Sequence, residues 1–198
     1  VMNDKSIKGF QQVIFDKNKI LAKNFRDCKK IYPFNYEVND RIILSYYFLN
    51  ILNSYIDFTK INSIVEIGGG SGHLMHLIKH HHKTKCIIDI DLPEVLIHTI
   101  PLVNSIFPNL KILLPNEISE INTHTLEEYD LIFATPNQIN LVPDNLIDLF
   151  ITTGTFGEMT KKQIAEYFKF IQRSGKNKSF FFNVNRVEKI PFNQEKID

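Results

Sequence analysis

The chain has 198 residues, of which 43% are hydrophobic and 23% charged, which is enough for one globular domain with a buried core. Its formal net charge of +1 excludes the excess of Lys and Arg typical of nucleic-acid-binding proteins. No apolar run approaches the roughly 20 residues of a membrane span. The two cysteines, Cys28 and Cys86, lack metal-ligand spacing, so we expect a reduced, cytoplasmic compartment.

Residues 1–60 are predicted to form a helical N-terminal cap segment. Apolar residues recur at loosely helical spacing from Phe10 to Phe25. A second amphipathic run extends over residues 41–55, with Asn39 or Asp40 as its N-cap. This segment has two candidate roles, as a cover over an active site or as the surface of a homodimer, and the oligomeric state stays open.

From residue 61 the pattern changes to alternating strands and helices. Strands are predicted at 64–67, 86–90, 131–135, 147–151 and 180–184, and helices at 73–80, 91–107 and 160–172. The run 110–114 is also strand-like and competes with 131–135 for the third position in the sheet. This alternation indicates a parallel sheet with helices on both faces. The predicted fold class is therefore α/β, a Rossmann-like three-layer sandwich over residues 61–198.

A glycine-rich segment, Glu66-Ile67-Gly68-Gly69-Gly70-Ser71-Gly72, joins the first predicted strand to the next helix. Glycines let the backbone turn tightly and approach a ligand closely, and the helix behind them points its amides at that ligand. The dinucleotide fingerprint needs a glycine at the sixth position counted from Gly68, where this chain has His73. The acid-x-Gly-x-Gly-x-Gly pattern fits without a mismatch. The segment thus predicts a nucleoside cofactor, with a purely structural turn as the alternative.

An acidic residue lies where a bound ribose would need one. Asp91 is 19 residues beyond Gly72, near the spacing of about 20 expected for an acid that binds ribose hydroxyls. A carboxylate can accept hydrogen bonds from two vicinal hydroxyls. The alternative role is N-cap of the next helix, with Pro93 in its first turn and Glu94 three residues on, and the two roles can coexist. Asp89 is the reserve candidate for the ribose.

In combination, the segments 66–72, 91–96 and 143–150 resemble the successive motifs of class I S-adenosylmethionine-dependent methyltransferases. The stretches 135–137, 156–159 and 185–186 are similar to the bacterial sugar O-methyltransferase family. The resemblance implies the class I methyltransferase fold, S-adenosyl-L-methionine as cofactor, and O-methylation of a sugar hydroxyl in surface polysaccharide biosynthesis. The class I sheet normally ends in an antiparallel hairpin, and the chain stops at Asp198 before supplying one. We therefore expect the C-terminal hairpin strands to be missing.

The resemblance also assigns cofactor-binding roles to individual positions. The residues that would surround the methionine part of the cofactor are Glu66, Gly68, Gly69, Gly70 and Gly72. Asp91 would hold the ribose. Asn137, which replaces the Asp common in the wider superfamily, would lie by the adenine, and the segment from Thr152 to Gly154 would line the cofactor.

Methyl transfer to a sugar hydroxyl benefits from a general base, because such a hydroxyl is a poor nucleophile. Glu158 lies past the fourth predicted strand, at the edge where an acceptor would enter, and is the candidate base. A solvated residue that precedes the next helix is the alternative interpretation. Asn185 and Arg186, after the fifth predicted strand, are candidates for binding acceptor oxygens, with an ordinary loop as the alternative.

No metal site is expected. His73, His76 and His80 share a helix face but lack further ligands, and Asp148 lies within a strand as a structural residue. Three functions stay open: a sugar O-methyltransferase, an O-methyltransferase of another small molecule, and a non-catalytic S-adenosylmethionine-binding scaffold protein. The expected partner is a small-molecule or saccharide acceptor, with no nucleic acid and no membrane span.

Overall fold

A parallel sheet forms the centre of the computed structural model, which describes residues 39–84 and 86–185. Within these residues the strand order is β3-β4-β2-β1-β5-β6, and every pairing is parallel. The strands are β1 (Ser63–Ile67), β2 (Cys86–Ile90), β3 (Ile112–Leu113), β4 (Leu131–Ala134), β5 (Ile147–Thr153) and β6 (Gly175–Val184). The helices are α3 (Asp40–Tyr55), α4 (His73–His81), α5 (Pro93–Ile106), α6 (Thr123–Glu128) and α7 (Lys161–Ser174), with the short 3₁₀ helices η1 (Phe58–Lys60), η2 (Pro115–Glu117), η3 (Pro136–Leu141) and η4 (Thr155–Glu158). This arrangement confirms the predicted α/β Rossmann-like fold.

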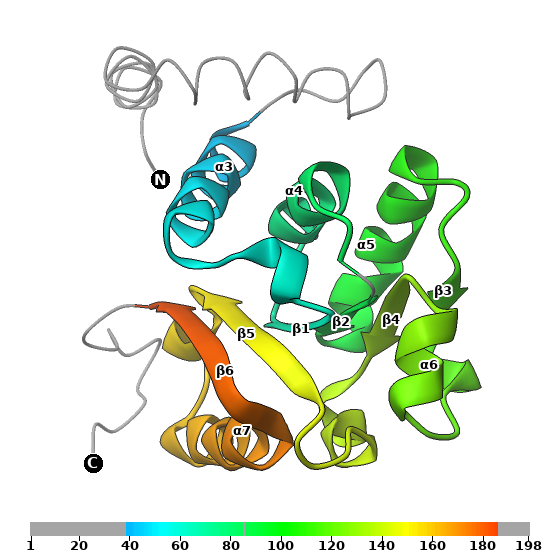
Figure 1. Cartoon of the computed structure of the whole chain (residues 1–198), viewed down its shortest axis with the longest axis vertical. Helices are drawn as coiled ribbons and strands as arrows, with labels where there is room; N and C mark the ends of the chain where they lie inside the picture. Colours follow the sequence, from blue (N-terminus) through cyan, green and yellow to red (C-terminus); the bar gives the residue numbers. More distant parts are fainter. Residues whose placement is uncertain (1–38, 85, 186–198) are drawn as a thin grey trace.

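Helices cover both faces of the sheet (Figure 1). Helices α3, α4 and α5 lie on one face, and α6 and α7 lie on the other. Successive residues of a strand point to opposite faces, so Ile64 packs into the first hydrophobic cluster and Val65 into the second. The two clusters give the three layers that the alternating sequence pattern predicts.

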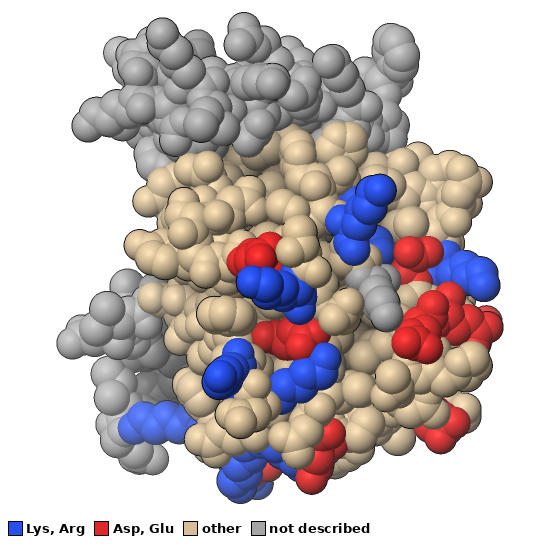
Figure 2. All heavy atoms as spheres, viewed as in Figure 1, with Lys and Arg blue, Asp and Glu red and all other residues tan. Residues whose placement is uncertain are grey.

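Charged side chains of both signs occur close together on the face of the molecule shown in Figure 2. This distribution agrees with the formal net charge of +1. No helix in the described parts of the chain is long and apolar enough to cross a bilayer.

Helix α3 belongs to the predicted N-terminal cap segment and packs beside α4. Asn39, one of the two predicted N-caps, accepts a hydrogen bond from Ile42 N through its side-chain oxygen at 3.1 Å. The buried residues Ile42, Tyr46 and Leu49 join the same hydrophobic cluster as the buried residues of α4. The rest of the predicted cap, residues 1–38, lies outside the described residues, as does the segment 186–198.

Both strand-like runs that compete for the third position enter the sheet. Strand β4 takes the position beside β2, which confirms the prediction for 131–135. The run 110–114 contributes only the two residues of β3, which pair with Leu131 and Ile132 on the outer side of β4. Asp130 helps to hold this edge, because its Oδ2 accepts a hydrogen bond from Lys111 N at 3.0 Å.

The strand order reverses at β1. From β1 the sheet continues to β2 and β4 on one side and to β5 and β6 on the other. In open α/β sheets, ligands bind outside the carboxyl ends of the strands at such a reversal. The loop 68–72 follows β1 directly, so the fold places the glycine-rich segment where a ligand is expected.

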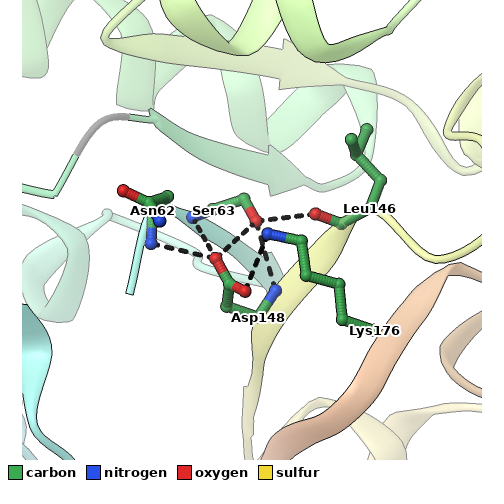
Figure 3. A network of polar contacts seen from close by, with 5 residues as sticks. All are labelled: Asn62, Ser63, Leu146, Asp148 and Lys176. Carbon is green, nitrogen blue, oxygen red and sulfur yellow. Dashed lines mark hydrogen bonds and ion pairs between the residues drawn. The ribbon is translucent and has the colours of Figure 1, made fainter. Parts of the chain in front are cut away.

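The opposite, amino edge of the sheet is held by a polar network around Asp148 (Figure 3). Asp148 Oδ2 accepts hydrogen bonds from Asn62 N at 2.9 Å and Ser63 N at 3.1 Å, and Lys176 Nζ lies 2.8 Å from Asp148 Oδ1. Ser63 Oγ also donates to Leu146 O at 2.9 Å. Burial raises the pKa of Asp148, but the Lys176 ammonium and the two amides outweigh it and hold the pKa below its usual value. These contacts confirm the structural role predicted for Asp148.

Candidate functional site

The loop after β1 has a backbone that favours glycine. Gly68, Gly70 and Gly72 have φ angles of +73°, +58° and +69°, in the left-handed region that other residues rarely adopt. A Cβ on Gly68 would overlap the side chain of Thr155. A Cβ on Gly70 would meet nothing within 4 Å. The loop is therefore tightly packed at Gly68 and open beside Gly70.

Hydrogen bonds from three other elements hold this loop in place. Gly68 N donates to Ile90 O at 2.8 Å, and Thr155 Oγ1 donates to Gly68 O at 3.1 Å. Thr99 Oγ1 of α5 donates to Gly70 O. The sequence did not predict either threonine as part of the site, because these contacts join residues 87 and 29 positions apart and no local pattern marks them.

The carboxylate of Asp91 contacts the backbone of the glycine loop. Its Oδ2 accepts a hydrogen bond from Gly70 N at 2.8 Å, and its Oδ1 accepts one from Leu92 N at 2.7 Å. The predicted N-cap role is wrong, because α5 begins at Pro93 with Leu92 as its N-cap and no side chain caps it. A carboxylate has about four acceptor positions, so these two bonds leave room for hydroxyl donors.

Two further carboxyl groups lie beneath the loop. Glu66 and Asp89 are directly paired in β1 and β2 and are 3% and 0% exposed. Burial and, after it, the Asp91 charge raise the pKa of Glu66 to about 7, against the lowering effect of the Met75 amide. Burial, and then the charges of Glu66 and Asp91, also raise the pKa of Asp89 well above its usual value, against the Gly69 amide. We call Glu66, Asp89 and Asp91 the carboxyl cluster.

The carboxyl cluster contains polar atoms that are costly to bury. Among the described residues, Glu66 Oε2 and both oxygens of Asp89 lack a hydrogen bond of good geometry, although the Gly69 amide lies close enough to lower the pKa of Asp89. Buried polar atoms are nearly always paired, so each exception calls for a physical explanation. Burial raises the pKa of Asp91 as well, and the charges of Glu158 and Glu94 add to this effect against the amides of Gly70 and Leu92.

Two predicted site residues belong to β5 and the segment after it. Glu158, the predicted base, follows β5, and Thr152, a predicted cofactor residue, lies near the end of β5. Glu158 is exposed on η4, which starts after Gly154 with its φ of +87°, and its charge acts on Asp91. Glu158 thus lies at the same edge of the sheet as the loop. Thr152 is fully buried near the end of β5, opposite Asn183 of β6, and its Oγ1 has no partner among the described residues.

The remaining predicted site residues differ in their surroundings. Asn137 is exposed on η3, which follows β4 at the carboxyl edge. Asn185 follows β6, its Oδ1 accepts a hydrogen bond from Phe156 N at 2.9 Å, and its Nδ2 donates to Asn183 Oδ1. Both polar ends of Asn185 are therefore engaged within the chain. Arg186 lies outside the described residues.

The histidines of α4 are held neutral. His73 and His76 are 5% and 0% exposed, and burial lowers their pKa values to about 4 and about 3. The charge of Arg41 adds to the lowering at His73, and His73 adds to it at His76. No group of three or more His, Cys, Asp or Glu in the described part of the chain is arranged to hold a metal ion.

Tyr167 of α7 is a further residue near this edge that the sequence did not predict. It is 6% exposed, and its ring packs against Phe156 with a centroid distance of 6.2 Å. Burial and, after it, the Asp91 charge raise the pKa of its phenol to about 12. Its helical spacing marks only a buried aromatic residue, so the sequence carried no signal of this proximity.

The chemistry of the loop separates two classes of cofactor. The amides of Gly68, Gly70 and Gly72 all donate within the protein, the last to Gly69 O at 2.9 Å. A dinucleotide pyrophosphate needs free amides at this turn and at the start of the helix. Here the amides of Gly68, Gly70 and Gly72 are occupied, and the carboxyl cluster lies next to them. The arrangement suits a ligand with positive charge and hydroxyl groups better than a polyanion.

No family model and no curated protein matches the chain. Among solved structures, the PH0226 protein from Pyrococcus horikoshii OT3 is 13% identical with a TM-score of 0.51, covering 80% of this chain and 65% of that one. An Archaeoglobus fulgidus S-adenosylmethionine-dependent methyltransferase is 13% identical with a TM-score of 0.46, covering 69% of this chain and 51% of that one. Phosphoethanolamine N-methyltransferase 1 of Haemonchus contortus, solved with phosphoethanolamine and S-adenosylhomocysteine, is 14% identical with a TM-score of 0.48, covering 71% and 25%. The chain thus spans about half or less of the last two proteins, and its likeness to the Pyrococcus horikoshii protein supports the fold described above.

Proposed function

We propose that this chain is the cofactor-binding part of an S-adenosyl-L-methionine-dependent O-methyltransferase. The acceptor is a hydroxyl group of a sugar, used in cytoplasmic steps of surface polysaccharide biosynthesis. In this proposal residues 61–198 bind the cofactor and residues 1–60 form the cap segment. The observation that carries the proposal is the glycine loop at the strand-order reversal, open beside Gly70 and surrounded by the carboxyl cluster.

The charge of the cofactor is the reason for this choice. S-adenosylmethionine carries a sulfonium, an ammonium and a carboxylate group and is cationic overall, whereas a dinucleotide carries an anionic pyrophosphate. Opposite charges within a few ångströms attract strongly where water is excluded. The buried, unpaired oxygens of Glu66 and Asp89 fit a cation above the loop, and they would repel a phosphate.

Each predicted residue has a role in this proposal. Glu66 and the glycines 68–72 surround the methionine part, and Asp91 accepts hydrogen bonds from the ribose hydroxyls through the acceptor positions that Gly70 and Leu92 leave unused. Thr152 lines the cofactor with its unpaired hydroxyl. Asn137 lies by the adenine, since η3 follows β4 at the same sheet edge.

When bound, the cofactor would supply a methyl group whose bond to sulfur breaks, with the electron pair kept by sulfur, as a bond to the acceptor oxygen forms. The chain has to align the acceptor hydroxyl and remove its proton. Alignment of reacting groups alone can lower a barrier by about 7–11 kcal/mol. Glu158, exposed at the carboxyl edge, takes the hydroxyl proton, and Arg186 holds acceptor oxygens. Asn185 contributes to the acceptor site beside its contact with Phe156.

The test uses the full-length protein, methyl-labelled S-adenosylmethionine, and a panel of free sugars, nucleotide sugars and polysaccharide fragments. We expect label transfer to at least one saccharide. The variant Glu158→Gln should lower turnover by about 10²- to 10⁴-fold with nearly unchanged cofactor affinity, because only the base is removed. Glu128→Gln is the matched control, since Glu128 ends α6 far along the chain from the loop, ahead of the amino end of β4.

Three outcomes would contradict the proposal in whole or in part. Full activity of the Glu158→Gln variant would remove Glu158 as the base. Cofactor binding without transfer to any acceptor of any class would instead indicate the non-catalytic scaffold protein. Transfer to a lipid or an aromatic hydroxyl, with none to a saccharide, would keep the reaction but replace the acceptor class.

A further inference from the structure

Asp89 is the most deeply buried member of the carboxyl cluster. Its side chain is 0% exposed, and among the described residues only the Gly69 amide acts on its oxygens as a donor, without the geometry of a full hydrogen bond. It lies directly under the loop, because a Cβ on Gly69 would come within 2.6 Å of Asp89 Oδ1. A ribose cannot reach a side chain in this position, so Asp89 is not a substitute for Asp91.

No described residue carries a positive charge that is paired with this carboxyl group. No described Lys or Arg forms an ion pair with any member of the carboxyl cluster. The groups whose charges act on Asp89 are Glu66 on β1 and Asp91 after β2, and both are acids. On α4, His73 and His76 are held neutral by burial, and the basic residues Lys79, His80 and His81 lie in the last turn of the helix. Helix α5 carries Glu94 in its first turn and His98 farther along. A buried carboxylate without a charged partner carries a large desolvation penalty, so it needs either a proton or a nearby cation.

We propose that Asp89 determines the charge that the cofactor must carry: it is the buried counter-charge that makes the loop prefer a sulfonium nucleoside to the neutral thioether left after methyl transfer. This inference rests on the proposed function and names a residue to which the sequence motif gives no role in charge selection. The geometry that carries it is the contact of Asp89 with the underside of Gly69, next to the open space beside Gly70.

The preference follows from proton exchange. In the free protein, burial and the neighbouring acids raise the pKa of Asp89 and so favour its protonated, neutral form. A cation above the loop replaces this proton, which leaves to solvent. The thioether product keeps the ammonium group but has lost the sulfonium charge, so it replaces the proton less well. The sulfonium form therefore binds with more proton release than the thioether form, and product leaves the loop more readily than substrate.

The test is calorimetry of the full-length protein with S-adenosylmethionine and with S-adenosylhomocysteine, each in two buffers of different ionisation enthalpy. We expect the wild type to prefer the sulfonium form and to release more protons with it. The variant Asp89→Asn keeps the volume and removes the charge, so the preference should fall at least about tenfold, mainly through weaker sulfonium binding. Asp144→Asn, at an exposed acid ahead of β5, is the control and should behave as the wild type.

The outcomes separate this inference from the proposed function. If the wild type binds neither sulfur nucleoside, the proposed function fails. If it binds both while Asp89→Asn shows the wild-type ratio of affinities and the same proton release, the function stands and the role of Asp89 is overturned. Asp89→Leu provides a second test, because an apolar side chain of similar size is compatible with this buried site even if the amide is not. It should lose the sulfonium preference as Asp89→Asn does.

Discussion

The buried carboxyl of Glu66 predicts an unusual pH dependence of stability. Its pKa is about 7 in the folded chain, against an ordinary value of 4.5, and the largest cause is burial. Between these two values the unfolded chain binds fewer protons than the folded one, so the free energy of unfolding falls as pH rises from 4.5 through 7. The full difference corresponds to about 3 kcal/mol.

The variant Glu66→Gln removes this titration. Gln is nearly the same size and still accepts a hydrogen bond from the Met75 amide, the one favourable contact that acts on the Glu66 carboxyl. At pH 4.5 the variant and the wild type should be similar in stability. At pH 8 the variant should be more stable, by up to about 3 kcal/mol.

The assay is urea denaturation without cofactor at half-unit steps from pH 4.5 to pH 8. Glu128→Gln, a change at a half-exposed side chain, should follow the wild-type curve. Asp89 and Asp91 shift in the same direction as Glu66, so the variant keeps part of the slope. Parallel curves for Glu66→Gln and the wild type, or a less stable variant at pH 8, would refute the reasoning.

Two further predictions concern the two edges of the sheet. Gly70→Val places a side chain in the open space of the loop at a φ of +58°, so S-adenosylmethionine affinity should fall at least about tenfold while backbone strain costs only about 1–2 kcal/mol of stability. Gly70→Ala, with the same backbone φ but less strain and less bulk, should bind better in the same calorimetric titration, and equal affinity in both variants would contradict this. Asp148→Asn removes the ion pair with Lys176 and should cost about 2 kcal/mol in thermal denaturation at pH 7. The loss should shrink as pH falls through the lowered pKa of Asp148, and cofactor affinity should not change; a fall in affinity would contradict the assignment of Asp148 to the amino edge.

The sequence predicted the regular parts of the fold because their signals are local. The β-branched run 86–90 is the strand β2, residue for residue. Thr160 and Gln163 form the predicted capping box, with Gln163 Oε1 accepting a hydrogen bond from Thr160 N at 2.8 Å. Helix α7 starts directly after Thr160. In both cases the chemistry that fixes the element lies within a few residues along the chain.

The misses come from contacts between distant segments. Strand β6 starts at Gly175, five residues before the predicted 180, because the register with β5 shifts and Lys178 adopts a φ of +70°. Lys176 in this irregular stretch reaches Asp148, which no local pattern announces. Likewise Asp91 was a reasonable N-cap by its spacing, and only the fold brings Gly70 N within reach of its carboxylate.

The central claim is that the loop and the carboxyl cluster bind a sulfonium nucleoside. The most direct measurement is a calorimetric titration of the full-length protein with S-adenosylmethionine, S-adenosylhomocysteine and NADH under the same conditions. We predict saturable binding of both sulfur nucleosides and no binding of NADH, because the loop amides are occupied and carboxyl groups lie beside them. Tight binding of NADH, with no response to either sulfur nucleoside, would contradict the account.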